Sequence, residues 1–247
     1  MSDCIVEVID LRKAFDSNEV LRGVSLSLDT GETLVVMGGS GSGKTVFLRQ
    51  VAGLSRPDAG QVRVFGVNIE ALSEEELLLL RRRMGYVFQG AALFDSLTTY
   101  ENVAYPLREH TSLAEAEIRE RVVRFLSMVG LGDDALSLLP AELSGGMRKR
   151  VGIARALIGE PEIMLFDEPT AGLDPTNSKM VADLIAHLKS GVCDTSIVVT
   201  HDLELTKTIA SRVAILIGGR FAAVGPLDAV LDSEQSDVQA FLAGEAR

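Results

Sequence analysis

Cysteine, aromatic residues and long apolar runs are scarce in this sequence. Its 247 residues include two cysteines, three tyrosines and no tryptophan. Cys4 and Cys193 lie far apart and have no metal-ligand spacing, so we expect two reduced thiols. No apolar run reaches the roughly 18 to 20 residues that a membrane-spanning helix needs. The densest run, Leu77–Leu80, lies between acidic and basic residues and predicts one buried helical turn.

Positive charge is also in deficit. Lys and Arg together number 24 against 35 Asp and Glu, which gives a net charge of −11. Such a surface disfavours general binding to nucleic acid, but it allows a nucleotide in a local pocket. The first ten residues carry acidic side chains and no basic cluster, a pattern that is not typical of a signal peptide.

Hydrophobic patterning predicts several strands. Residues 5–11, 20–28 and 60–66 are expected to be strands, and Val24, Leu26 and Leu28 alternate with serines as in a half-buried strand. The run 33–37 is short and continuously apolar, which is typical of a strand buried on both faces, and further strands are expected at 162–166, 196–200 and 213–217. Helices are expected near 44–52, 145–159, 176–190 and 203–210. This alternation predicts an α/β fold with a mostly parallel core sheet. We also expect an antiparallel β region at the N-terminus.

The middle of the sequence differs in pattern from the parts on either side. Capping boxes at Ser73/Glu76 and Ser112/Glu115 predict the starts of two helices. The second helix would carry a stripe of apolar residues from Ile118 to Val129. We therefore expect a single domain over 1–247, in which 1–94 and 144–247 form the α/β core and 95–143 form a helical insertion.

A phosphate-binding loop follows the strand at 33–37. The stretch "GGSGSGKT" (38–45) fits G-x-x-x-x-G-K-[ST] between a buried strand and a helix. Backbone N–H groups of such a loop surround phosphates, Lys44 would reach the β- and γ-phosphates, and the Thr45 hydroxyl would bind Mg²⁺. The predicted nucleotide-binding residues here are Gly38, Gly39, Ser40, Gly41, Ser42, Gly43, Lys44, Thr45 and Val46.

Acidic residues and a histidine follow two other buried strands. In "IMLFDEP" (163–169), Asp167 would hold Mg²⁺ and Glu168 would act as a general base or orient water. The alternative is a solvated pair at a strand end. His201 follows the strand at 196–200, where it either has a structural role or contacts the γ-phosphate.

A glycine-rich turn, "LSGGM" (143–147), precedes the helix expected at 145–159. Its N–H groups could bind an anion at the helix N-terminus, or the turn could simply begin the helix. The basic triplet Arg148–Arg150 that follows could attract a nucleotide; we favour instead a solvated helix face.

Taken together and in order, the motifs "GGSGSGKT", "YVFQG", "LSGGM", "IMLFDEP", "AGLD" and "VVTHD" resemble those of the ATP-binding cassette (ABC) ATPases over nearly the whole chain. The resemblance implies binding and hydrolysis of ATP with Mg²⁺ by a head-to-tail homodimer. In that arrangement Ser144, Gly145 and Gly146 complete the site of the other subunit.

The same resemblance suggests roles for further residues. Gln89 would contact Mg²⁺ or the attacking water, His201 the γ-phosphate, and Asp174 would lie in the loop that crosses the dimer interface. Phe15 would stack on adenine, or else pack in the core. The expected catalytic residues are thus Glu168, His201, Lys44 and Gln89, and the expected metal ligands are Thr45, Gln89 and Asp167.

Met147 stands where the family most often has Gln. "LSGGM" and the segment 92–110 resemble the bacterial lipid-asymmetry (Mla-type) subgroup. That resemblance implies phospholipid transport between envelope membranes, at the cytoplasmic face of the inner membrane. The implied partners are permease subunits, a membrane-anchored lipid-binding protein and a small regulatory subunit, with no nucleic acid. The alternatives are an importer of amino acids or other small solutes, a soluble ABC ATPase of DNA repair or translation, and a module that does not hydrolyse ATP.

Overall fold

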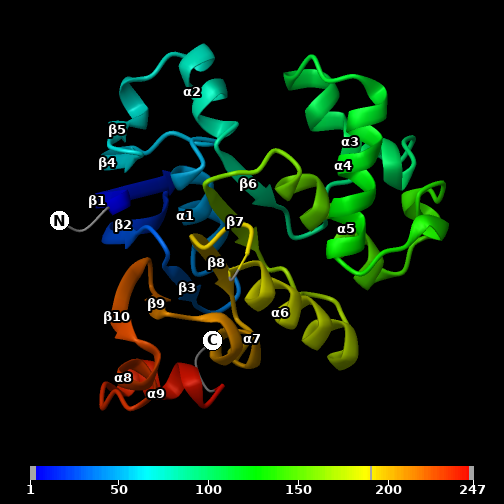
Figure 1. Cartoon of the computed structure of the whole chain (residues 1–247). Coiled ribbons are helices and arrows are strands. Elements are labelled where there is room, and N and C mark those ends of the chain that lie inside the picture. The colour runs from blue at the N-terminus through cyan, green and yellow to red at the C-terminus, as the bar shows by residue number, and fades with distance from the viewer. Residues whose placement is uncertain (1–3, 190, 245–247) are drawn as a thin grey trace.

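A computed structural model describes residues 4–189 and 191–244 (Figure 1). The strands are β1 (Cys4–Phe15), β2 (Asn18–Asp29), β3 (Thr33–Met37), β4 (Ala59–Val64), β5 (Val67–Asn68), β6 (Met84–Val87), β7 (Ile163–Asp167), β8 (Ser196–Thr200), β9 (Arg212–Ile217) and β10 (Arg220–Pro226). The helices are α1 (Lys44–Val51), α2 (Glu74–Arg81), α3 (Thr99–His110), α4 (Glu115–Met128), α5 (Gly145–Leu157), α6 (Pro175–Lys189), α7 (Leu203–Ile209), α8 (Leu227–Leu231) and α9 (Ser236–Leu242).

The larger sheet has the strand order β10-β9-β3-β8-β7-β6. From β9 to β6 neighbouring strands run parallel, and β10 pairs antiparallel with β9. The α/β fold with a mostly parallel core sheet, predicted from the sequence, is confirmed. Parallel strands place their carboxyl ends at one edge, so the segments after β3, β7 and β8 lie together.

The central strands are buried on both faces, as their apolar runs predicted. In β3, Val35 and Met37 belong to the core that packs against α5, α6 and the helical lobe. Leu34 and Val36 point the other way, into the core shared with α1 and the second sheet. The alternation of side chains along a strand thus lets one five-residue strand stabilise two layers.

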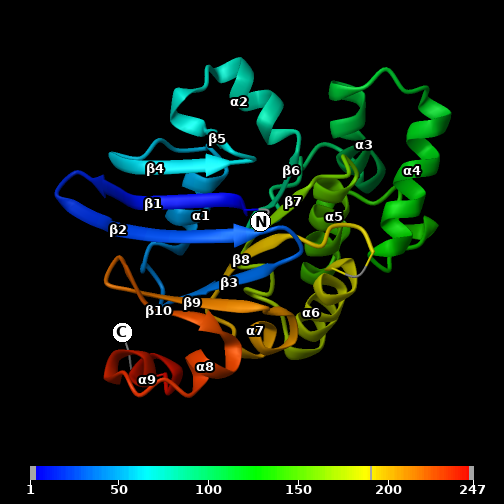
Figure 2. The ribbon, with the colours of Figure 1, turned by 60° about the vertical axis from the view of Figure 1, so that its left-hand side comes forward.

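The second sheet is antiparallel, with the order β2-β1-β4-β5. In β2, Val24, Leu26 and Leu28 are buried while Ser25 and Ser27 are exposed, which confirms the predicted alternation. The buried side packs toward α1, which lies between the two sheets (Figure 2). The glycine loop that begins α1 is therefore held between two layers.

Helices α3 and α4 form a lobe beside the sheets (Figure 1). On α4, Ile118, Val122 and Phe125 are buried, as the predicted stripe requires. The capping box predicted at Ser112/Glu115 is wrong, because the cap lies at Ala114, whose N–H donates to Glu117 at 3.1 Å.

Glu115 is instead held by contacts with α3. Its carboxylate accepts a hydrogen bond from the Tyr100 hydroxyl at 2.7 Å and pairs with Arg108. These contacts across the two helices compete with capping of the helix start. The other predicted capping box, Ser73/Glu76 at the start of α2, is confirmed.

Further expectations from the sequence can be compared with the structure. The turn Leu77–Leu80 is only half buried, because the helical period turns Leu78 and Leu79 outward while Leu77 and Leu80 face the core.

Cys4 and Cys193 are free thiols, the first exposed and the second buried. The helix expected at 176–190 ends at Lys189, and residue 190 lies outside the described residues. Within the described ranges, no helix is long and apolar enough to cross a membrane.

Candidate active site

The loop between β3 and α1 has backbone conformations that explain its glycines. Gly41 and Gly43 have φ of +75° and +105°, the left-handed region that favours glycine. A Cβ on Gly43 would lie 3.0 Å from Val20 of β2, so the loop also packs too closely for a side chain there. At Gly39 and Gly41 an added Cβ would meet nothing within 4 Å, so these glycines border open space.

The groups around this open space suit a phosphate. The Ser42 hydroxyl oxygen is buried and has no hydrogen-bond partner among the described residues. Lys44, at the start of α1, is 7% exposed, and its ammonium donates to the carbonyl oxygens of Gly38 at 2.8 Å and Gly39 at 3.0 Å. A buried hydroxyl without a partner, a lysine and the N-terminus of α1 together fit a bound anion.

Asp167, the last residue of β7, accepts a hydrogen bond from the Thr45 hydroxyl at 2.8 Å. Burial raises the pKa of Asp167, and the hydrogen bond from Thr45 opposes that shift. Hydroxyl and carboxylate oxygens are ligands that Mg²⁺ prefers, and this ion commonly takes few ligands from protein when it also binds phosphates. Thr45 and Asp167 therefore fit the predicted metal site.

Glu168 lies beside Asp167 but faces different partners. One carboxylate oxygen lies 3.2 Å from the Lys44 ammonium, and the other accepts from the Thr200 hydroxyl at 3.2 Å. The second oxygen also lies 3.0 Å from Nδ1 of His201. The solvated strand-end pair considered from the sequence is wrong, since Asp167 and Glu168 are 3% and 7% exposed. A buried carboxylate beside a lysine and a histidine suits acid–base chemistry.

Thr200 and Tyr86 are two residues of this edge that the motifs did not single out. Thr200 ends β8 directly before His201 and bonds Glu168. The Tyr86 hydroxyl on β6 lies 3.4 Å from Asp167, and burial raises the pKa of Tyr86. Thr200 could have been found as the last residue of a buried strand. Tyr86 required the knowledge that β6 pairs with β7.

Other predicted residues belong to other parts of the fold than the phosphate loop. Gln89 is exposed in the turn after β6. Asp174 directly precedes α6, and its carboxylate accepts a hydrogen bond from the Asn177 N–H at 3.0 Å, which lowers the pKa of Asp174. Phe15, at the end of β1, is 50% exposed, which excludes the alternative of a core position.

The Ser144 turn begins α5, where the Ser144 hydroxyl accepts from the Met147 N–H at 3.2 Å. A Cβ on Gly146 would meet the Asn177 side chain at 2.4 Å, so this glycine allows α5 to approach α6. Among the described residues, no hydrogen bond or ion pair joins 144–146 to 38–45.

The basic triplet after the turn does not form one solvated face. Arg148 is exposed, but Lys149 is 6% exposed, so the prediction of a solvated face is wrong for Lys149. The Lys149 ammonium donates to the backbone carbonyl oxygens of Gln89 and Glu168. The positions of the triplet on a helix do not by themselves reveal these contacts.

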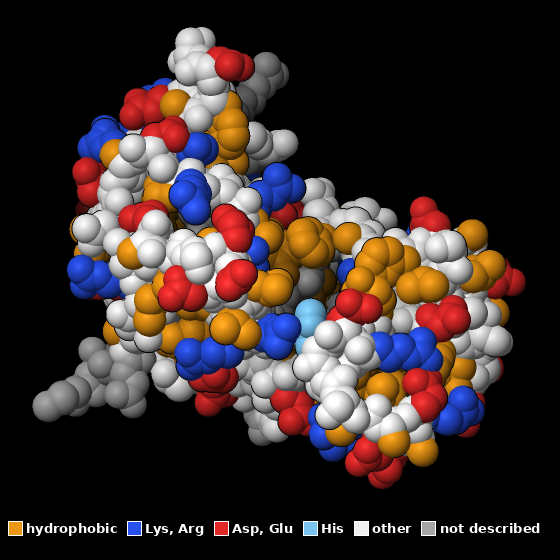
Figure 3. Space-filling view, turned by 90° about the horizontal axis from the view of Figure 1, so that it is seen from above, with side chains coloured by type: hydrophobic (Ala, Val, Ile, Leu, Met, Phe, Trp, Pro, Cys, Tyr) orange, Lys and Arg blue, Asp and Glu red, His pale blue; other side chains and the backbone are white. Residues whose placement is uncertain are grey.

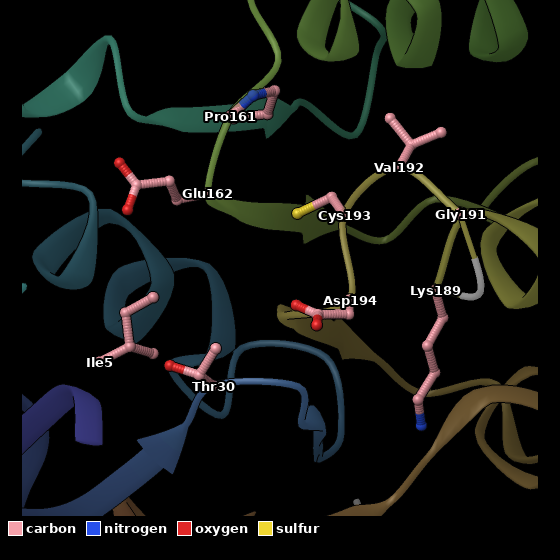
Figure 4. Close-up of a pocket in the computed structure, with 9 residues that line it drawn as sticks. All are labelled: Ile5, Thr30, Pro161, Glu162, Lys189, Gly191, Val192, Cys193 and Asp194. Atoms are coloured by element: carbon pink, nitrogen blue, oxygen red, sulfur yellow. The ribbon is translucent and has the colours of Figure 1, made fainter. Parts of the chain in front are cut away.

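A cavity of about 540 Å³ lies at the opposite ends of the strands (Figure 4). Its lining residues include Glu162 just before β7 and Cys193 just before β8. None of the predicted site residues lines it. The candidate site is therefore the place where Lys44, Asp167 and Glu168 meet at the carboxyl edge of the sheet, and not this cavity.

Comparison with known proteins agrees with that geometry. The ABC transporter family model matches residues 21–171. The chain belongs to the ABC transporter family. The dimeric ATP-binding cassette MJ0796 in a post-hydrolysis state, bound to ADP and Pi, superposes with a TM-score of 0.84 at 32% identity, over 90% of this chain and 98% of that one. Members of the family bind ATP with Mg²⁺ and hydrolyse it.

Curated relatives have names that refer to transport. The probable ribonucleotide transport ATP-binding protein mkl of Mycobacterium tuberculosis (strain ATCC 25618 / H37Rv) is 41% identical over 97% of this chain and 66% of its own length. The methionine import ATP-binding protein MetN of Brucella abortus (strain 2308) is 41% identical over 95% of this chain and 63% of its own length. The chain thus spans slightly less than two thirds of these relatives.

Proposed function

We propose that this chain is the ATP-hydrolysing energy subunit of an ABC transport complex. The observation that carries the proposal is the convergence of the Lys44–Glu168 ion pair and the Thr45–Asp167 hydrogen bond at the carboxyl edge of one sheet. The family match and the superposed cassette dimer support it.

In the proposed mechanism each residue has a separate task. The loop 38–43 and Lys44 would bind the phosphates, and Thr45, Asp167 and Gln89 would hold Mg²⁺, whose charge would neutralise that of the phosphates. Glu168 accepts a proton from the attacking water, and its hydrogen bonds to Thr200 and His201 fix the direction of its carboxylate. Lys44 and His201 stabilise the charge that develops on the γ-phosphoryl group.

The complete site requires a second copy of the chain. Ser144, Gly145 and Gly146 form the N-terminal end of α5, and within the described residues no hydrogen bond or ion pair joins them to the phosphate loop at 38–45. In a head-to-tail homodimer they would contact the nucleotide held by the partner, with Asp174 at the interface and Phe15 against the adenine. A helix N-terminus with exposed N–H groups suits that phosphate contact.

The transported molecule is proposed to be a phospholipid, moved between bacterial envelope membranes through a permease dimer. Met147 and the segment 92–110 support this through their resemblance to the lipid-asymmetry subgroup. In that segment Phe94 and Tyr105 are 44% and 40% exposed, and their rings pack 4.9 Å apart, as an aromatic contact surface for a partner would. A membrane-anchored lipid-binding protein and a small regulatory subunit are proposed as further partners.

We propose that the permease binds the face of the molecule that Figure 3 shows, where α2 and the helical lobe lie. A groove of about 390 Å³ lies between α2 and the helical lobe, lined by apolar side chains such as Leu78 and Pro106 and by cations such as Arg81 and Arg155. Figure 3 shows apolar and basic side chains along this hollow. Contact here would place the chain at the cytoplasmic face of the inner membrane.

A second candidate function is the import of a small solute. It is favoured by the names of the relatives, which refer to ribonucleotide transport and to methionine import. The experiment is affinity purification from gently solubilised membranes, with mass spectrometry of proteins and lipids. Phospholipid with a permease and a lipid-binding protein supports the first candidate, and a soluble solute-binding protein supports the second. The absence of any membrane protein contradicts both.

A further inference from the structure

Lys149 is buried beside the candidate site although its neighbour Arg148 on α5 is exposed. Its side chain is 6% exposed, and its ammonium donates to the backbone carbonyl oxygen of Glu168 at 3.1 Å and to that of Gln89. One side chain thus joins the residue after β7 to the turn after β6. Among the described residues, no ion pair includes Lys149.

The backbone that Lys149 holds is conformationally strained. Glu168 has φ of +46°, and Ala91 and Ala92, shortly after Gln89, have φ of +62° and +47°. Non-glycine residues remain in this region only where the surrounding structure holds them. Arg155 on the same helix donates to the carbonyl oxygens of Ala91 at 2.8 Å and Ala92 at 2.9 Å. Helix α5 therefore fixes both strained segments with cations.

A lysine is an unusual choice for a purely structural role here. Burial lowers the pKa of Lys149, and the nearby carboxylates of Glu168 and Asp167 only partly oppose that shift. A buried ammonium whose partners are carbonyl dipoles generally costs more than a well-packed apolar side chain of similar size. The residue that benefits from the ammonium is Glu168, whose peptide carbonyl is held by Lys149 and whose carboxylate is held by Lys44.

We propose that Lys149 is a positioning residue for ATP hydrolysis, which fixes the peptide of Glu168 relative to the turn that carries Gln89. This inference rests on the proposed function, because it assigns Glu168 and Gln89 to the attacking water. In the proposed mechanism Lys149 contacts neither the attacking water nor the γ-phosphoryl group. It acts through the backbone, so its loss changes where the carboxylate points rather than whether nucleotide binds.

The test compares Lys149→Met, which keeps the length and removes the donors, with Lys149→Arg, which restores donors. We expect Lys149→Met to lower kcat for ATP about 10- to 100-fold, the range for a misplaced catalytic group, with KM and nucleotide affinity nearly unchanged. Lys149→Arg should recover most of kcat. The matched control is Arg150→Met, since Arg150 is the next residue and also donates to backbone carbonyls, those of Val129 and Gly130, which lie in the helical lobe.

Amide hydrogen exchange gives a readout that does not depend on activity. Without nucleotide, the amides of residues 89–92 should exchange faster in Lys149→Met than in wild type, and not in Arg150→Met. If Lys149→Met does not fold, Lys149→Gln, whose side chain is too short to join both carbonyls, carries the same expectations. Unchanged kcat in the folded variant, or an equal loss in Arg150→Met, overturns the inference. An inactive wild type overturns the proposed function instead, and exchange at 89–92 then decides the role of Lys149.

Discussion

The Lys44 ammonium lies 3.2 Å from the Glu168 carboxylate, and the two side chains are only 7% and 10% exposed. The pair neutralises two charges that a water-poor site would otherwise penalise. It also joins the residue proposed to bind phosphate to the residue proposed to activate water. A phosphate that binds Lys44 must therefore compete with Glu168 for the ammonium. When the phosphate wins, the Glu168 carboxylate is free to accept a proton from the attacking water, as proposed.

Replacing Lys44 by Ala should remove most ATP hydrolysis. Loss of one preorganised electrostatic group at a reacting centre typically lowers kcat by about 10² to 10³. The measurement is steady-state release of phosphate by purified protein. Arg63→Ala is the control, because Arg63 is a surface cation paired with Glu7 on the second sheet. Turnover near the wild-type rate in Lys44→Ala would contradict the assignment of the phosphate loop.

Glu168→Gln should separate binding from hydrolysis. The amide keeps the size of the side chain but cannot accept the proton of the attacking water, so hydrolysis stops while nucleotide still binds. We expect the variant to form a stable dimer in MgATP, measured by sedimentation, whereas wild type should dimerise only transiently. A variant that stays monomeric in MgATP would be inconsistent with closure around two nucleotides.

Phe15→Ala should weaken nucleotide binding without altering the chemical step. An exposed ring that stacks on a base contributes about 0.5 to 1.5 kcal/mol, which corresponds to a loss of affinity of about 2- to 12-fold. Phe15→Tyr keeps the aromatic face and serves as the control. Equal affinity of wild type and Phe15→Ala, measured with a fluorescent ATP analogue, would show that this ring does not contact the base.

The Arg83–Glu162 pair gives a prediction on pH and stability. Hydrogen bonds from Arg83 lower the pKa of Glu162, so the folded-state pKa lies below the unfolded value of about 4.3. The pair therefore stabilises the fold above about pH 4.3 and loses its contribution as pH falls through the folded pKa. Glu162→Gln should lower Tm slightly at pH 7, consistent with about 0.2 to 1 kcal/mol for a half-exposed pair, and should match wild type near pH 2. An equal difference at both pH values would point to lost packing.

Much of the fold was predictable because local patterns and tertiary packing agree. The alternation from Val24 to Leu28, the apolar run of β3 and the capping box at Ser73 each describe one strand or helix and its solvent exposure. The prediction at Ser112 failed because Glu115 is taken by side chains of another helix. The sequence around Ser112 contains no information about side chains of α3 that bind Glu115 instead.

In the candidate site, too, some features could be predicted from the sequence and others depend on tertiary contacts. Asp167 ends a buried strand, and Lys44, Glu168 and His201 come after buried strands, so their meeting at the carboxyl edge of a parallel sheet could be predicted from the sequence. The role of Thr200 depends on which oxygen Glu168 turns toward it, and the burial of Lys149 depends on how α5 packs on the turn after β6. These contacts join segments far apart in the sequence and require the folded chain.

The most direct test of the central claim mixes two inactive variants. Lys44→Ala disables the phosphate loop, and Ser144→Arg blocks the turn proposed to act on the partner's nucleotide. In a mixed dimer one site carries both changes, and the other combines an intact loop with an intact turn. The account predicts that mixing restores ATP hydrolysis, while each variant alone stays inactive. Two inactive variants that remain inactive after proven mixing would contradict a site shared between two copies of this chain.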